Sequence, residues 1–122
     1  MTEGRRPRRV AEGIRSVLST LIARELADPR LTALVITSVE VPPDLGLAYV
    51  KVRLLVGGDE PAARQKALWT LQRAAGRLRR ALAPQLRLKR VPELRFDYDT
   101  APDDRARVEQ LLQEIAEGDA ER

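Results

Sequence analysis

Two acidic residues near the C-terminal end of the chain have the spacing of a paired-carboxylate site. Asp97 and Asp99 lie in a segment that alternates apolar and charged residues, so both would occupy the same face of a strand. Two such carboxylates can hold a hard cation or work as an acid and base pair. The sequence offers no third ligand and no residue that would orient a base. Solvated surface carboxylates are therefore the favoured interpretation. An enzyme that acts on nucleic acid through Asp97 and Asp99 is a remote alternative to the binding functions considered below.

Cationic side chains form a more distinctive pattern. At about 100° per residue, four residues of one predicted helix share a sector of about 60°: Lys66, Arg73, Arg77 and Arg80. We call them the cationic row, and such a row could follow the phosphates of RNA. The alternative is an ordinary solvated face. Arg73 and Arg77 stand four residues apart, and repulsion without a nearby acid favours a binding role.

Further cations extend this candidate RNA-binding surface. They are Arg5, Arg6, Arg8 and Arg9 at the N-terminus, Arg30 after the first predicted helix, Arg79 in the second, and Arg87, Lys89, Arg90 and Arg95 after it. The last four would extend the surface or lie on both sides of a loop. The N-terminal group would order on RNA or remain a disordered arm. Arg79 would contact RNA or brace the helix. Trp69, beside the cationic row, would stack on a base or pack in the core.

Composition excludes several functional classes. The chain has no histidine and no cysteine, which removes the commonest general base, the thiolate nucleophile and most zinc sites. It contains no Walker loop, HExxH, GxSxG or dinucleotide fingerprint. We therefore expect no catalysis, no cofactor and no metal.

The 122 residues suit one domain. No apolar run approaches a membrane span, and no apolar signal region follows the basic N-terminus, so we expect a cytoplasmic protein without a membrane partner. Nothing in the sequence suggests more than a monomer.

Charge is unevenly distributed along the chain. Residues 1–95 carry 19 Lys and Arg against 9 Asp and Glu, a net charge of +10, whereas residues 96–122 carry 3 against 9, a net charge of −6. A cationic body is typical of proteins that bind polyanions, because neutralised phosphates release counterions. Nucleic acid is the first partner to consider.

Apolar periodicity predicts three helices and three strands. The helices cover residues 10–26, 61–86 and 102–116, and the strands cover 34–41, 47–56 and 93–98. A turn at 42–46, with Gly46 supplying a positive φ, joins the first two strands. Gly76 predicts a bend or a close backbone approach in the second helix, and Pro84 is expected to end it. The elements predict an α+β fold with the helices over one face of the sheet.

Five segments resemble the ribosome-binding factor A family, from about Arg9 to Ile115. In chain order they are Arg9-Val10-Ala11-Glu12 with Ile14-Arg15, the run Arg24 to Leu31 (RELADPRL), Pro43-Asp44-Leu45 with Ala48 and Val50, Gly76-Arg77-Leu78-Arg79 with Leu82, and Pro92-Glu93-Leu94-Arg95-Phe96 with Asp99. Each motif is weak alone, and together in order they are specific.

The resemblance implies a type II KH-like fold, which we place at residues 9–116. Charge and polarity of the flanking residues predict a basic arm at 1–8 and a polar tail at 117–122. In this fold a kink carrying Ala-x-Gly replaces the clamp loop of other KH domains, and Ala74 and Gly76 match that pattern. The resemblance also implies a factor without catalytic activity. It would bind the immature small (30S) ribosomal subunit and its 16S precursor rRNA, assist late maturation and rRNA processing, and matter most in the cold.

A second hypothesis makes the chain a protein-interaction adaptor. Its basic surface would then meet an acidic partner such as an assembly GTPase, and the acidic segment after Phe96 would shield the body.

Overall fold

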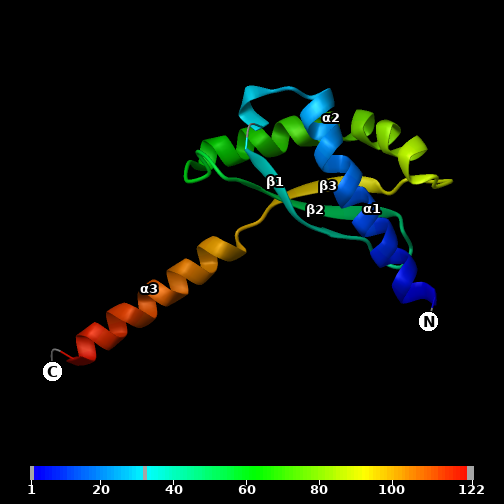
Figure 1. Ribbon diagram of the computed structural model, residues 1–122. Coiled ribbons are helices and arrows are strands. Elements are labelled where there is room, and N and C mark those ends of the chain that lie inside the picture. The colour runs from blue at the N-terminus through cyan, green and yellow to red at the C-terminus, as the bar shows by residue number, and fades with distance from the viewer. Residues whose placement is uncertain (1, 32, 121–122) are drawn as a thin grey trace.

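The computed structural model describes residues 2–31 and 33–120, with side chains described for 6–29, 31 and 33–119. The elements are α1 (Thr2–Glu25), a short 3-10 helix η1 (Pro29–Leu31), β1 (Leu34–Glu40), β2 (Leu47–Leu54), α2 (Pro61–Leu86), β3 (Glu93–Tyr98) and α3 (Ala101–Ala120). Figure 1 shows α1 and α2 packed beside the sheet and α3 extending away from it. The predicted α+β order of elements is confirmed.

The hairpin between β1 and β2 is antiparallel, with a bulge between Ile36 and Ser38. At its turn, Asp44 Oδ1 accepts a hydrogen bond from the Gly46 amide at 3.0 Å, a bond typical of aspartate in turns. The positive φ of the turn falls on Leu45, at 58°, and not on Gly46. The bonded Asp44 side chain holds the loop in shape without using the conformational freedom of the glycine.

The third strand pairs with β2 in the parallel direction, so β2 is the central strand of the sheet. Parallel neighbours require a crossover connection, which α2 provides. β3 pairs with a strand on one side only, so it is an edge strand, and α2 packs along it. Gln72 of α2 donates to the Leu94 carbonyl at 3.2 Å and accepts from the Phe96 amide at 3.2 Å. One glutamine side chain thereby continues the ladder along the free edge of β3.

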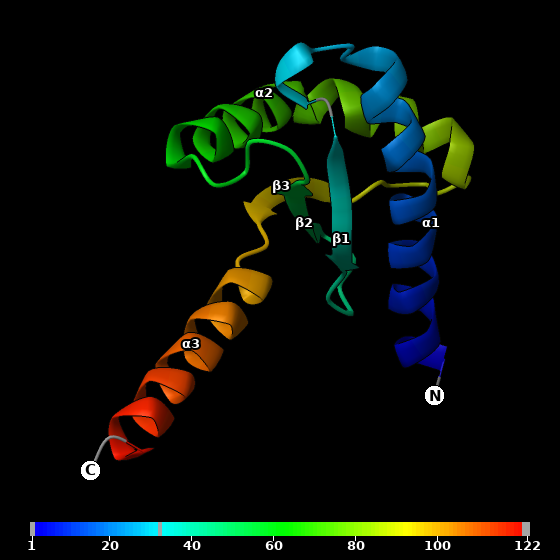
Figure 2. The same cartoon turned by 60° about the vertical axis from the view of Figure 1, so that its left-hand side comes forward.

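The core lies between the sheet and the two helices α1 and α2, which cover one face of it (Figure 2). Its fully buried side chains come from every layer: Ile14 and Leu18 of α1, Leu71, Leu78 and Leu82 of α2, Val50 and Val52 of β2, and Leu94 of β3. The helical and strand periodicities of the sequence therefore point to the same interior.

The second helix is uninterrupted from Pro61 to Leu86. Pro84 lies inside it, so the expectation that this proline ends the helix is wrong. The helix ends where Arg87 adopts a left-handed conformation (φ 52°, ψ 34°). No backbone approaches Gly76 closely, since the nearest atom to a Cβ built there would be Arg80 Nη1 at 3.6 Å. In Figures 1 and 2 α2 arcs over the sheet, and Gly76 and Pro84 are the residues in it that favour bending.

Both ends of the chain are more helical than expected. The residues predicted as a basic arm belong to α1, which contains Pro7 and begins at Thr2. The segment predicted as a polar tail continues α3 as far as Ala120. Pro7 lies just beyond the first turn of α1, where a proline removes one backbone hydrogen bond and its ring crowds the carbonyl four residues before it, yet the helix continues through it.

The C-terminal helix does not cover the sheet, which corrects the prediction of helices over one face for this element. Its apolar stripe is exposed: Val108, Leu111, Leu112 and Ile115 have exposed fractions of 51 to 62%. α3 extends away from the basic body, so it does not shield that body as the adaptor hypothesis expected (Figure 1). Among the described residues, none of the helices has the length and apolar character needed to cross a membrane.

Candidate nucleic-acid interface

The cations of the cationic row are all exposed, whereas Leu71, Leu78 and Leu82 of the same helix are buried. Amphipathic spacing thus leaves one side of α2 to the core and presents the row to solvent. Of the ion pairs between described side chains, none involves a member of the row. The positive charge of this surface is therefore not neutralised within the described part of the protein.

Trp69 lies outside the core, with an exposed fraction of 54%. The guanidinium carbon of Arg73 sits 4.7 Å from the centroid of its ring, within the range of a cation–π contact. Of the two places that the sequence allowed for this tryptophan, the structure selects the surface.

Arg77 Nη2 donates to the backbone carbonyl of Glu25 at 3.3 Å. Glu25 is the last residue of α1, where unsatisfied carbonyls concentrate negative partial charge. The repulsion between Arg73 and Arg77 is thus offset by an aromatic ring on one side and by a helix terminus on the other. The Arg73–Arg77 repulsion is therefore no evidence for RNA binding. RNA binding is supported instead by the exposure of the row.

Arg79 differs from its neighbours because it is half-buried and bonded. Its Nε donates to the Val91 carbonyl at 2.8 Å, which ties α2 to the segment that leads into β3. This contact favours the bracing role over an RNA contact. Arg80 is exposed, and its guanidinium lies beside Gly76.

A second group of cations converges at the other end of α2. Residues far apart in the sequence line one cavity of about 610 Å³, which we call the basic cleft. Its cations are Arg6 of α1 and Arg87, Lys89 and Arg90 of the segment between α2 and β3. The one carboxylate among its lining residues, Asp44, already accepts the Gly46 amide. Such a cleft matches the chemistry of a phosphate backbone.

Arg87 occupies this cleft at a conformational cost. Its left-handed backbone (φ 52°) at the C-terminal end of α2 is the position that glycine usually takes. For a residue with a Cβ, that conformation costs about 1–2 kcal/mol. Ala27, Ala33 and Leu45 also have positive φ, so the candidacy of Arg87 rests on its charge and its place in the cleft and not on the strain.

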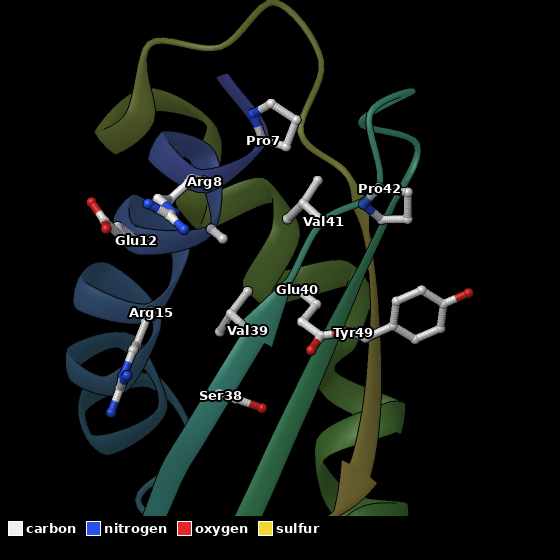
Figure 3. Close-up of a pocket in the computed structure, with 11 residues that line it drawn as sticks. Pro7, Arg8, Glu12, Arg15, Ser38, Val39, Glu40, Val41, Pro42 and Tyr49 are labelled. Atoms are coloured by element: carbon white, nitrogen blue, oxygen red, sulfur yellow. The ribbon is translucent and has the colours of Figure 1, made fainter. Parts of the chain in front are cut away.

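Arg8 and Arg9 are not among the residues that line the basic cleft. Arg8 lines a groove of about 530 Å³ between α1 and β1, together with Arg15, Glu12 and Glu40 (Figure 3). Two cations and two carboxylates balance there, so this groove has no preference for a polyanion. Arg9 is exposed on α1. The side chains of Arg5 and Arg30 lie outside the described residues.

One of the paired carboxylates, Asp99, has a structural partner. Asp99 Oδ1 accepts the Ala101 amide at 3.1 Å at the start of α3, and this backbone hydrogen bond is the main cause that lowers the Asp99 pKa. Asp97 is exposed. Within residues 6–29, 31 and 33–119, no group of three or more potential metal-ligating side chains is present. The arrangement assigns Asp99 to capping the helix.

The sequence analysis missed a cluster at the base of α3. Arg53 forms two hydrogen bonds with the carboxylate of Asp103, and Arg64 adds a third at 3.1 Å. The Tyr98 ring lies beneath both guanidinium groups, at 5.7 and 4.3 Å. An acidic residue in the first turn of a helix was the available signal, but no pattern within one element connects it to arginines on β2 and α2.

Comparison with known proteins gives a consistent result. Residues 6–112 match the model of the family described as ribosome-binding factor A. A protein of that name from Sorangium cellulosum is 46% identical over 93% of this chain and 91% of its own length. Another, from Alkalilimnicola ehrlichii, is 45% identical over 93% of this chain and 86% of its own.

Solved structures agree with these matches. The crystal structure of ribosome-binding factor A from Thermus thermophilus is 30% identical, with a TM-score of 0.65, and covers 75% of this chain and 94% of that one. A Thermus thermophilus model fitted into a cryo-EM map of a complex with the 30S subunit is 32% identical, with a TM-score of 0.57, over 72% and 89% of the two chains.

Proposed function

Because this chain belongs to the ribosome-binding factor A family, we propose that it binds the immature small ribosomal subunit and its precursor 16S rRNA. In this role it assists late maturation and rRNA processing as a cytoplasmic monomer, without catalysis, and matters most in the cold. The basic cleft carries the proposal, because it gathers cations from α1 and from the end of α2 into one cavity suited to a phosphate backbone.

The cationic row supplies the second part of the proposed surface. Its members are exposed and take part in no ion pair between described side chains, so they are available to phosphates. The sheet and helix scaffold fixes both regions before RNA arrives. With few aromatic residues in the chain, recognition rests mainly on the shape and backbone of the RNA.

Sedimentation tests the proposed partner. Tagged protein in a lysate of cold-grown cells is resolved on a gradient at low and at high salt. We expect it to move with free small subunits and their precursors and to be absent from translating ribosomes. Migration only at the top of the gradient at both salt concentrations would contradict the proposal.

A matched pair of variants tests the surface. The cleft variant changes Arg6, Lys89 and Arg90 to Gln, and the control changes the exposed Arg15, Arg105 and Arg107 to Gln, with the same loss of charge. We expect the cleft variant to lose co-sedimentation. We also expect its plot of log affinity for single-stranded RNA against log salt to be shallower by about 0.7 for each phosphate that it no longer neutralises. Equal effects in both variants would assign the change to net charge.

One observation favours the adaptor as a second candidate function. The exposed apolar stripe of α3 is the kind of surface that contacts another protein, such as an assembly GTPase. Pull-down from RNase-treated lysate separates the two functions. An adaptor keeps its partner after the RNA is destroyed, whereas a factor held on the subunit by RNA is released.

A further inference from the structure

The only tryptophan of the chain lies at the mouth of a cavity outside the basic cleft. A niche of about 360 Å³, here called the Trp69 niche, opens where α2 passes the end of α1. It is lined by Leu26, Asp28, Trp69, Thr70, Arg73, Ala74 and Arg77. An indole that is 54% exposed leaves a large aromatic surface in water, which packing in the core does not explain.

The indole is already used as a stacking platform. The guanidinium of Arg73 is a flat cation, and it lies 4.7 Å from the ring centroid. A nucleobase is also flat and can stack on the same ring. At an exposed site the cation–π contact is worth about 0.5–1 kcal/mol, and a base stacked on an aromatic residue is worth about 1–3 kcal/mol. A base is therefore able to displace the guanidinium.

The surroundings of the niche favour a ligand that carries phosphate. Arg77 borders the niche and is held in place by the Glu25 carbonyl at 3.3 Å. The carboxylate of Asp28 also lines the niche, but Arg73 and Arg77 leave the lining with a net positive charge. Lys66 lies one helical turn before Thr70 on the same helix and is exposed. Once displaced from the ring, Arg73 is free to pair with a phosphate next to the stacked base. A peptide with an acidic side chain would satisfy the arginines but would leave the indole bare.

We propose that the Trp69 niche binds an unpaired nucleobase of single-stranded RNA, which stacks on Trp69 in place of Arg73 while Arg73 and Arg77 contact the adjacent phosphates. This inference rests on the proposed RNA binding and adds to it a base-contacting site. It also assigns the cationic row to a single-stranded segment, because the bases of a duplex are stacked on each other.

A single tryptophan allows a direct test, because all indole emission comes from this site. The full chain is titrated with a labelled 12-nucleotide oligouridine, and label anisotropy and indole emission are followed in the same samples. A duplex RNA of equal length is the comparison. We expect oligouridine to quench the emission with the same midpoint as the anisotropy, and the duplex to leave the emission unchanged.

Variants separate stacking from mere proximity. We expect Trp69→Leu to weaken oligouridine binding about 5- to 150-fold, which corresponds to the loss of one stacked base. Trp69→Phe retains an aromatic face and should recover most of the affinity. Val56→Ala, which shortens another exposed apolar side chain, is the control. Thermal unfolding of each variant establishes that the fold is intact.

The outcomes distinguish this inference from the proposed function. Anisotropy that rises without quenching, or unchanged affinity in Trp69→Leu, would overturn the niche and leave RNA binding in place. Absence of binding to both oligouridine and duplex RNA would also overturn the niche, whereas the proposed function is overturned only by loss of co-sedimentation with small subunits.

Discussion

The carboxylate of Asp103 receives two hydrogen bonds from Arg53, at 2.8 Å from Nη2 and at 3.0 Å from Nη1. Arg53 belongs to the central strand β2, and Asp103 belongs to the first turn of α3. This paired geometry is the most specific form of an arginine–carboxylate contact. It fixes the base of a helix that is otherwise exposed, so the attachment of α3 depends on very few side chains.

The first prediction concerns the variant Asp103→Asn. The side-chain amide has one acceptor oxygen and no charge. It cannot accept both hydrogen bonds from Arg53, and Arg53 and Arg64 lose their counter-ion. We expect faster hydrogen exchange of the backbone amides at the start of α3, with the exchange of the core strands unchanged. Asp119→Asn, which removes the same charge near the far end of the helix, is the control. Equal exchange in both variants would refute the role of Asp103.

The second prediction is a pH dependence of the same contact. The arginine hydrogen bonds lower the Asp103 pKa from 3.8 to about 2. A carboxyl group whose pKa is lower in the folded state stabilises the fold fully above its ordinary pKa, and that stabilisation is lost as pH falls through the folded-state value. We expect protection at the start of α3 to be constant near neutral pH and to fall as pH drops from about 4 to about 2. Asp103→Asn should lack this step.

The third prediction concerns the edge of β3. Replacing Gln72 by Ala leaves the Leu94 carbonyl and the Phe96 amide without their side-chain partner. Because water can reach this exposed edge, we expect a loss of about 0.5–1.5 kcal/mol in the free energy of unfolding, measured by denaturant titration. Gln65→Ala removes an exposed glutamine from the same helix and should change stability by less than about 0.5 kcal/mol.

The fourth prediction contrasts two adjacent arginines. Arg79→Ala loses the bond to the Val91 carbonyl and should destabilise the fold by about 1–2 kcal/mol. Arg80→Ala should leave stability within about 0.5 kcal/mol of the parent and weaken RNA binding. Thermal unfolding and RNA titration are measured for both variants. The assignment fails if Arg79→Ala weakens RNA binding at unchanged stability.

The fifth prediction concerns the left-handed residue of the basic cleft. Arg87→Gly relieves the backbone strain at φ 52° and should stabilise the fold by about 1 kcal/mol. The same change removes a cation from the cleft and should weaken RNA binding. A rise in melting temperature together with a loss of affinity would identify a position where function opposes stability. A gain in both properties would remove Arg87 from the proposed interface.

Periodicity within single elements predicted most of the fold. The spacing of Leu71, Leu78 and Leu82 identified the buried side of α2, and the alternation of Leu94 and Phe96 identified the buried face of β3. These predictions succeed because buried residues recur with the period of the helix or strand that carries them. The stripe on α3 shows the limit of this reasoning, since Leu111 and Leu112 follow the same rule and remain exposed.

Contacts between distant segments were the part that the sequence did not reveal. Arg6 and Lys89 share the basic cleft although nothing in their spacing relates them. Trp69 illustrates a second limit. A helical wheel placed it beside the cationic row, but only the packed structure shows that its ring lies in solvent and not in the core. Nothing in the sequence indicated that Arg77 would bond to the end of α1, because that bond depends on how the two helices cross.

The parallel pairing of β2 with β3 also sets an order of events during synthesis of the chain. The β1–β2 hairpin joins neighbouring segments and can close early, whereas β3 has to cross the whole of α2 before it can pair. α2 is therefore made before the strand against which it packs, and until Tyr98 has been added its packing rests mainly on α1. The proposed RNA-binding surface on α2 therefore becomes fixed only after β3 has joined the sheet.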